Sequence, residues 1–295
     1  MDVLVAGGTG FVGTALCAEL DRRGHAVTAL SRSPETVELP SGVETVAADA
    51  TDYEAVLPRV EGRDAVVNLI ALSPLFTPPD GLTHHGVHVG ATEATVEAAE
   101  TAGVDRYLQL SAIGADPDGD TEYSRAKGLA EQTVRESALD WTIVRPSIVF
   151  GEGGEFIPFL KRVTPGPIKA LPGGGTTQFQ PIWVGDLAAI LVDALTADHH
   201  VGSIYELGGP AVYTLADITR LAYAAEGRSV TIAAVPMGLT RLGLTLADPV
   251  PGIPMGTDQA AALGEDNIAD DNDIAAFDRT AEDLRTLEDY LDITS

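Results

Sequence analysis

The amino-acid sequence predicts an α/β protein built on a doubly wound parallel sheet, with a smaller C-terminal lobe. Two observations support this fold class. Short apolar, β-branched runs alternate with helical segments through the first half of the chain, and a glycine-rich turn directly follows the first run. Strands that are separated by helices pair in parallel through right-handed crossovers, which is the doubly wound arrangement.

Residues 1–150 are expected to form one domain of six strands and four helices. Short, mainly apolar runs predict the strands, at 3–7, 26–30, 43–48, 65–71, 106–111 and 141–146. Helices are expected at 11–23, 53–60, 87–102 and 123–137; in the first of them Val12, Leu16 and Leu20 lie on one face.

Glycine and proline interrupt this alternation after Phe150. We expect residues 151–181 and 203–295 to form the smaller lobe, which would cover a substrate. Residues 182–202 are expected to return to the first domain through a helix at 186–195.

Further elements of the C-terminal half follow from local signals. Asp186 is the expected N-cap of the returning helix, and Thr214 caps the next one. A last helix is expected over residues 279–291. The acidic, turn-rich segment 247–273 is either a loop of the lobe or partly mobile.

The charge of the chain is strongly acidic, with 44 Asp and Glu against 18 Lys and Arg and a net charge of −26. Such a surface repels nucleic acid and anionic membranes, so we exclude both as partners. The composition resembles that of halophilic proteins, whose self-repulsion is screened in concentrated salt. An acidic surface for one basic partner is the alternative.

Cysteine usage and the N-terminus indicate a cytoplasmic protein. Cys17 is the only cysteine, which excludes an internal disulfide and a cysteine-based zinc cluster. The N-terminus enters an apolar strand without a positively charged segment or a cleavage site. No apolar run approaches the ~18 residues of a membrane span.

The turn after the first strand carries a dinucleotide-binding pattern, GGTGFVG. Glycines at this place let the backbone turn tightly and approach a pyrophosphate, which binds the N–H groups of the helix N-terminus. A plain strand-to-helix turn is the alternative. The pattern assigns these residues to cofactor binding: Gly7, Thr9, Gly10, Phe11, Val12 and Gly13.

The end of the second strand favours NADP(H) over NAD(H). A carboxylate is expected there if the ribose 2′-hydroxyl of NAD is bound, but Ser31 and Arg32 occupy the place. A guanidinium favours a 2′-phosphate. The alternative is an arginine that only faces solvent.

The end of the third strand predicts an adenine contact. Asp49 would accept a hydrogen bond from the adenine amino group, with the backbone of Ala50 beside it. The competing interpretation is that an aspartate here only caps the next helix, and for Asp52 we favour the cap.

Tyr123 and Lys127 are the candidate catalytic pair. They lie four residues apart on an expected helix and therefore on one face of it. An ammonium beside a phenol lowers its pKa, which makes tyrosine a better acid and base. Ser111 closes the fifth strand at the sheet edge where such folds bind ligands, and its hydroxyl would polarise a substrate carbonyl.

These motifs resemble the extended branch of the short-chain dehydrogenases/reductases, a Rossmann-fold family. GGTGFVG, NLIA, Ser111, YSRAK and RPSIVFGEG match its landmarks in order, most strongly over residues 1–155. More narrowly the chain resembles the atypical group that contains the NADPH-binding accessory subunit of respiratory complex I and nucleoside-diphosphate-sugar epimerases.

The resemblance implies roles for particular residues. Tyr123 would be the acid and base, Lys127 would hold the nicotinamide ribose and tune Tyr123, and Ser111 would orient the carbonyl. Ala71, at the end of NLIA, and Pro146 and Ser147 would contact the cofactor. The chain is therefore expected to be an NADP(H)-binding oxidoreductase that transfers hydride to or from a carbonyl or alcohol of a small-molecule substrate.

Two other functions stay open at this point. One is a non-catalytic NADPH-binding module of a larger assembly, and the other is a nucleotide-sugar epimerase or dehydratase. A homodimer is equally open.

The sequence departs from the family at His88, where many members carry an asparagine of the proton relay. His88 either substitutes for it or packs on the helix. His84 and His85 are expected to be loop histidines, since a metal site would need a third ligand, and no metal is assigned. His199 and His200 are expected at an exposed helix end.

Overall fold

The computed structural model describes residues 1–236 and 264–293. The chain divides into two compact units, which we call unit 1 and unit 2. Unit 1 comprises Met1–Leu72, Pro79–Pro146 and Val184–Glu206. Unit 2 comprises Ser73–Pro78, Ser147–Trp183 and Leu207–Ser295. That unit 2 covers a substrate stays a prediction.

Unit 1 contains a seven-stranded sheet in the order β11-β6-β5-β4-β1-β2-β3. The strands are β1 (Asp2–Ala6), β2 (Ala26–Ser31), β3 (Val43–Ala47), β4 (Ala65–Asn68), β5 (Arg106–Leu110), β6 (Asp140–Pro146) and β11 (Ser203–Leu207). From β3 to β6 every neighbouring pair is parallel. The predicted Rossmann-type fold class is confirmed.

The strand order reverses between β1 and β4, which makes their carboxyl ends the point where such sheets bind ligands. The register pairs Ala6 of β1 with Asn68 of β4, so both strands end at the same level. The central strands are buried on both faces, since Val3, Leu4 and Val5 have no exposed surface. The segments that follow these ends therefore have a rigid base.

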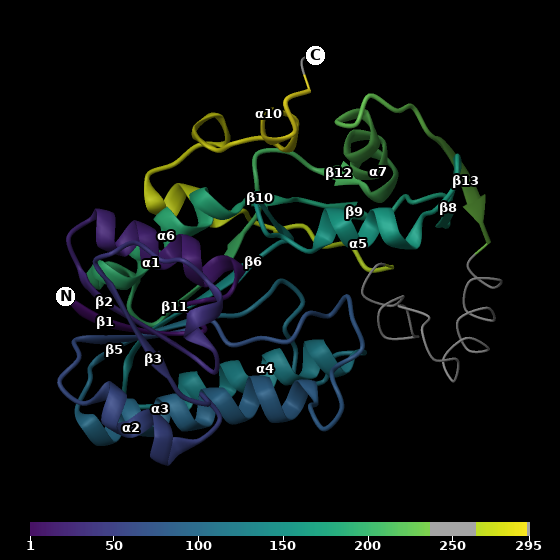
Figure 1. The fold of residues 1–295 in the computed structure, drawn as a ribbon. Helices are drawn as coiled ribbons and strands as arrows, with labels where there is room; N and C mark the ends of the chain where they lie inside the picture. The colour runs from purple at the N-terminus through teal and green to yellow at the C-terminus, as the bar shows by residue number, and fades with distance from the viewer. Residues whose placement is uncertain (237–263, 294–295) are drawn as a thin grey trace. The chain divides into compact units, whose positions relative to one another are not determined.

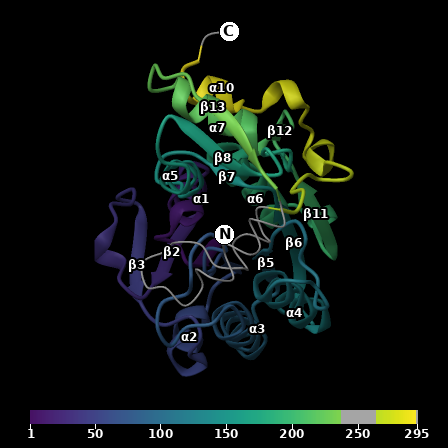
Figure 2. The same ribbon diagram turned by 90° about the vertical axis from the view of Figure 1, so that its right-hand side faces the viewer.

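Helices cover both faces of this sheet (Figures 1 and 2). One face carries α2 (Tyr53–Val60), α3 (Gly90–Ala102) and α4 (Glu122–Glu136). The other face carries α1 (Phe11–Arg22) and α6 (Val184–Thr196).

Local capping explains where several helices begin and end. The Asp52 side chain accepts hydrogen bonds from the N–H groups of Glu54 and Ala55, so the predicted cap of α2 is confirmed. Gly103, with φ of +71°, ends α3 in the left-handed conformation. The prediction for Asp186 is wrong: α6 begins at Val184, because the strand before it runs directly into the helix, and Asp186 lies in its first turn.

Unit 2 is built from three helices and three strand pairs among the described residues. The helices are α5 (Phe156–Val163), α7 (Leu215–Ala224) and α10 (Leu287–Tyr290). The pairs are β7 (Val149–Phe150) with β10 (Ile182–Trp183), β8 (Ile168–Pro172) with β13 (Thr231–Val235), and β9 (Gln178–Phe179) with β12 (Tyr213–Thr214).

A separate apolar core holds unit 2 together, with Phe150, Phe159 and Phe179 almost fully buried. The predicted cap of α7 is confirmed, because Thr214 and Asp217 exchange the two hydrogen bonds of a capping box.

The helix predicted over 279–291 is wrong. A 3-10 turn (Ala281–Asp283) is separated from α10 by residues 284–286, and the extended backbone of Leu284 interrupts the helix. Of the acidic segment 247–273, residues 247–263 lie outside the described residues. The remainder includes Asn267 and leads into the 3-10 turn Asp273–Phe277.

Candidate functional site

The glycine turn after β1 is tightly packed. Gly7 has φ of +83°, a conformation that favours glycine. A Cβ on Gly13 would lie 2.1 Å from the Gly7 carbonyl oxygen, and one on Gly8 would lie 2.6 Å from the Ala29 Cβ. Gly10 is the N-cap of α1 and offers no side-chain cap, so the first N–H groups of α1 are left without one.

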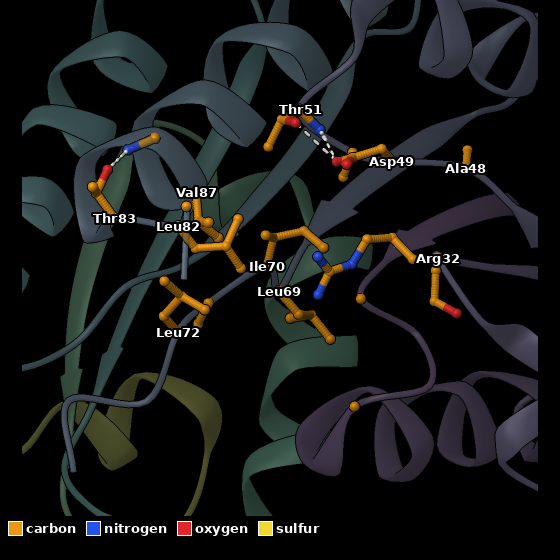
Figure 3. A pocket seen from close by; sticks show the side chains of 17 residues that line it. Arg32, Ala48, Asp49, Thr51, Leu69, Ile70, Leu72, Leu82, Thr83 and Val87 are labelled. Carbon is orange, nitrogen blue, oxygen red and sulfur yellow. Dashed lines mark hydrogen bonds between the residues drawn. The ribbon is translucent and has the colours of Figure 1, made fainter. Parts of the chain in front are cut away.

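A pocket of about 370 Å³ opens beside this turn, at the carboxyl ends of the unit 1 strands (Figure 3). It is lined by Gly7, Gly10, Ser31, Arg32, Ala48, Asp49, Ala50, Thr51, Leu69, Ile70, Ala71, Leu72, Gly81, Leu82, Thr83, Gly86 and Val87. Apolar side chains on one side and a few polar groups on the other are typical of a cofactor site.

The polar side of the pocket is formed by Ser31, Arg32 and Asp49. The Ser31 Oγ is buried and has no hydrogen-bond partner within the described ranges 1–236 and 264–293. Figure 3 shows the Arg32 side chain extending across the pocket toward Ile70. A buried hydroxyl without a partner is costly, so a ligand group that bonds it would be stabilised here.

Asp49 is held as an acceptor at the end of β3. Its carboxylate accepts hydrogen bonds from the backbone N–H of Thr51 at 3.0 Å and from the Thr51 hydroxyl at 2.8 Å. The backbone bond from Thr51, with the positive charge of Arg32 as a smaller cause, holds the pKa of Asp49 below its usual value. Asp49 is therefore ionised at neutral pH.

The pocket brings together seven of the predicted cofactor residues: Gly7, Gly10, Ser31, Arg32, Asp49, Ala50 and Ala71. Thr9, Phe11, Val12 and Gly13 lie in the turn and in the first turn of α1 instead. Sequence reasoning missed the wall formed by Leu82, Thr83 and Val87. No motif marks this wall, because the loop before α3 has no regular pattern.

Pro146 and Ser147 are not among the residues that line this pocket. The Ser147 hydroxyl is 3% exposed and donates to the Asn267 carbonyl oxygen at 2.6 Å, within unit 2. Pro146 ends β6 in unit 1, and its carbonyl accepts from Ile113 N–H. Their cofactor contacts stay predictions.

Tyr123 and Lys127 lie in the first two turns of α4. Thr121 caps this helix by accepting from the Ser124 N–H at 3.0 Å. The Lys127 Nζ lies 5.9 Å from the centre of the Tyr123 ring and donates to the Leu110 carbonyl oxygen at 3.0 Å. The lysine side chain is only 3% exposed.

The pKa of Tyr123 is not lowered in this structure, in contrast to the expectation from the sequence. Burial raises the pKa of the Tyr123 phenol above its usual value, since a phenolate loses hydration there. Burial also lowers the pKa of Lys127 to about 8, which the charge of Glu131 partly opposes. The Lys127 amine is therefore mostly protonated near neutral pH, and it loses its proton at slightly higher pH.

Ser111 is bonded to a carboxylate that sequence reasoning missed. Its Oγ donates to the Glu131 Oε1 at 2.5 Å. Arg145 donates to both oxygens of Glu131, at 2.9 and 2.7 Å, and to Glu206 at 3.2 Å. Glu131 follows Lys127 by four residues, so helical spacing was the available signal.

The histidines before α3 are not loop residues, which corrects the predictions for His84 and His85. His85 and His88 lie in a π turn (His85–Val89), and His84 directly precedes it; His84 and His88 are buried, while His85 is exposed. Their rings lie 5.6 and 5.4 Å from the Tyr123 ring, both edge to face. Single π turns inside helices are frequent at functional sites.

His88 also contacts Leu72, one of the residues that line the pocket. Its Nε2 accepts from the backbone N–H of Leu72 at 3.3 Å, while its Nδ1 is buried without a partner among the described residues. His200 is buried as well, at 2% exposure, which corrects the prediction of an exposed end for this residue. It packs there because it bonds the Tyr205 hydroxyl.

The described ranges contain neither a cluster of side chains that could bind a metal ion nor a helix that could span a membrane. No group of three or more His, Cys, Asp and Glu side chains there is arranged to hold a metal ion. Likewise, none of the helices in these ranges has the length and apolar character needed to cross a membrane.

The family model described as NAD(P)H-binding matches residues 7–198, which include the glycine turn, the pocket and α4. The chain belongs to the NAD(P)H-binding family. The resemblance to an NAD(P)-binding family that was stated from the sequence motifs is therefore confirmed.

Two relatives are similar to this chain in sequence, and a solved structure is similar to it in fold. The mitochondrial NADH dehydrogenase [ubiquinone] 1 alpha subcomplex subunit 9 of Arabidopsis thaliana is 32% identical over 74% of this chain, which spans 56% of that protein's length. The NAD(P)H azoreductase of Xenophilus azovorans is 28% identical over 82% of this chain and 80% of its own. UDP-glucose 4-epimerase of Thermus thermophilus, solved with NAD, shares the fold with a TM-score of 0.66, 21% identity and full coverage of both chains.

The residues of this NAD(P)H-binding chain fit a dinucleotide. A side chain on Gly10 would project toward the Gly7 carbonyl, 3.2 Å away, so glycine keeps the turn open to a pyrophosphate. The orphaned Ser31 hydroxyl and Arg32 suit the ribose end. Asp49 suits an amino donor such as that of adenine.

Proposed function

We propose that this protein is an NADP(H)-dependent oxidoreductase acting on a carbonyl or alcohol of a small molecule. One observation carries the proposal. Leu72 lines the glycine-turn pocket, its N–H is bonded to His88, and the His88 ring packs edge to face on Tyr123. His88 is thus the one residue between this lining residue and the predicted acid and base, which supports the proposal.

The preference for NADP(H) rests on the end of β2. The buried Ser31 hydroxyl lacks a partner within the described ranges, and the Arg32 guanidinium lies in the same pocket. A 2′-phosphate would accept hydrogen bonds from both, whereas a carboxylate that would bind the ribose hydroxyls of NAD is replaced here by Ser31.

The bound cofactor would supply hydride transfer at its nicotinamide ring. Tyr123 would give its phenolic proton to the substrate oxygen during reduction and take it back during oxidation. The positive charge of Lys127 would favour the phenolate that remains. The Ser111 hydroxyl would orient the substrate oxygen by donating a hydrogen bond to it. To do so, Ser111 must give up the hydrogen bond that it now donates to Glu131.

A non-catalytic NADPH-binding module is the second candidate. Two observations favour it: burial raises the pKa of Tyr123, and the Ser111 hydroxyl already donates its hydrogen bond to Glu131. The relative whose name is that of an NADH dehydrogenase subunit makes association with a larger assembly a specific alternative. Nucleotide-sugar epimerisation is the third, because an epimerase shares the fold.

A spectroscopic assay separates the three. The protein is incubated with NADPH and a panel of carbonyl compounds, and then with nucleotide sugars. Net oxidation of NADPH supports the oxidoreductase, sugar interconversion without net oxidation supports an epimerase, and tight binding without either supports the module.

The variant Tyr123→Phe tests the mechanism. It removes only the hydroxyl, so turnover is expected to be lost while the NADPH dissociation constant stays nearly unchanged. Tyr53→Phe, which alters a tyrosine on α2 outside the site, is the matched control and keeps wild-type turnover. Undiminished turnover in Tyr123→Phe would falsify the assigned acid and base.

A further inference from the structure

The buried carboxylate of Glu131 links the groups of the candidate site. It is 3% exposed and stands on α4 four residues after Lys127, on the same face of the helix. Its Oε1 accepts from the Ser111 hydroxyl at 2.5 Å and from the Arg145 Nε at 2.9 Å. Its Oε2 accepts from the Arg145 Nη2 at 2.7 Å.

We propose that Glu131 is a positioning residue of this site, whose carboxylate orients the Ser111 hydroxyl and supplies the counter-charge of the Lys127 ammonium. This inference rests on the proposed function. An isolated charge is costly to bury, so a carboxylate at this depth needs several partners, and Glu131 has them.

Arg145 and Glu206 give the carboxylate a fixed place. The Arg145 guanidinium grips both oxygens of Glu131 in a bidentate pair and reaches Glu206 on β11 at 3.2 Å. Such forks fix orientation as well as distance. The β6 and β11 strands thus hold the charge that faces Ser111 at the end of β5.

The charge balance around Lys127 depends on this carboxylate. The titratable and charged groups linked to Lys127 or to Glu131 come from four elements: Tyr123 and Glu131 on α4, His84 and His88 at the π turn, Arg145 on β6 and Glu206 on β11. The carboxylates of α3, which also packs on α4, are exposed. Glu131 is the negative charge whose attraction to Lys127 raises its pKa against the effect of burial.

The chain offers a direct measurement, because Lys127, Lys161 and Lys169 are its only lysines. NMR of protein labelled with ¹³C at lysine Cε follows the titration of each one, and Lys161→Arg and Lys169→Arg assign the signals. In the wild type the Lys127 midpoint is expected at about 8. In Glu131→Gln we expect it to fall by about one pH unit, since an opposite charge is lost.

Glu136→Gln is the matched control. It removes the same charge from the same helix, at an exposed position, and should leave the Lys127 midpoint in place. Should Glu131→Gln not fold, Glu131→Asp withdraws the carboxylate by one methylene and is expected to lower the midpoint by less. An unchanged midpoint in whichever of the two folds overturns the proposal.

Turnover is measured on the same samples as a function of pH. The proposal expects the alkaline limb of the profile in Glu131→Gln to move to lower pH together with the Lys127 midpoint, while Glu136→Gln keeps the wild-type profile. If the wild type does not turn over but the Lys127 midpoint is still displaced in Glu131→Gln, the proposed function is contradicted. The coupling between Glu131 and Lys127 is then still supported. Wild-type turnover with an unmoved midpoint contradicts the role of Glu131 alone.

Discussion

The Nε2 atom of His88 accepts a hydrogen bond from the backbone N–H of Leu72 at 3.3 Å. This bond joins the π turn to Leu72, which lines the glycine-turn pocket, and makes Nε2 an acceptor. The remaining proton of the neutral ring then lies on Nδ1, which is buried and has no partner over the described residues. Charging this imidazole would leave a cation without hydration.

His88 should therefore make the protein sensitive to acid. Burial lowers the pKa of His88 from 6.5 to about 2, so between these values the unfolded chain binds a proton that the folded chain does not. The stability contributed by neutral His88 is fully present above pH 6.5 and is lost as the pH falls below it, by at most about 1.4 kcal/mol per pH unit.

The variant His88→Asn removes this group. Urea unfolding between pH 7 and about 5 should show a smaller loss of stability in His88→Asn than in the wild type. His85→Asn, at the exposed neighbouring histidine, should keep the wild-type slope. Equal slopes in wild type and His88→Asn would mean that His88 is protonated in the folded protein.

Arg32 should set the preference between the two nicotinamide cofactors. Its guanidinium lines the pocket next to Ser31, where a 2′-phosphate would bring two negative charges. In Arg32→Ala the NADPH dissociation constant is expected to rise by about tenfold or more, corresponding to ~1.4 kcal/mol, with little change for NADH.

The control for this variant is Arg59→Ala, which removes an exposed arginine from α2. Fluorescence titrations with both cofactors measure all four constants. If NADPH and NADH weakened equally in Arg32→Ala, the arginine would act on the shared part of the two cofactors, and the NADP(H) preference would lose its support.

The fold was predictable because its signals are local. The strands of unit 1 are short apolar runs, and Gly7 and Gly13 mark a turn that no larger residue fits, so the sheet and the cofactor end could be inferred from spacing alone. Similarly, Asp52 and Thr214 cap helices through bonds within three residues.

The rest of the site depends on distant packing. The Ser111–Glu131 bond joins residues twenty positions apart and exists only once α4 lies against β5. The pKa of Tyr123 follows from the depth at which the phenol is buried, which spacing along a helix does not reveal. The π turn that buries His88 has no sequence signature either.

Gly13 should be intolerant of any side chain. A Cβ there would lie 2.1 Å from the Gly7 carbonyl oxygen, which is backbone and cannot rotate away. Gly13→Ala should therefore push α1 off the turn and lower both stability, by about 1–3 kcal/mol, and NADPH affinity. Gly24→Ala, at a surface turn with open space around it, loses stability through its φ of +82° but should retain NADPH affinity. Calorimetry with and without NADPH separates the two effects, and wild-type affinity in Gly13→Ala would contradict the proposed place of the pyrophosphate.

The net charge of −26 should make stability depend on salt. Self-repulsion among carboxylates opposes folding, and salt shortens its range from about 10 Å at 0.1 M to ~3 Å at 1 M. The unfolding midpoint in urea is therefore expected to rise between about 0.1 M and 2 M KCl. The opposite result, an unchanged or falling midpoint, would favour the interpretation of the acidic surface as a binding face for one basic partner.

The exposed face of α3 provides a test of whether self-repulsion causes this salt dependence. Glu93 and Glu97 stand one helical turn apart on it, a like-charge arrangement that destabilises a helix by a few tenths of a kcal/mol. The double variant Glu93→Gln/Glu97→Gln should be more stable than the wild type in low salt and gain less from KCl. If repulsion is what KCl relieves, the two proteins converge in concentrated salt; if the salt acts by strengthening apolar burial, both gain equally, because the core of unit 1 is the same in each.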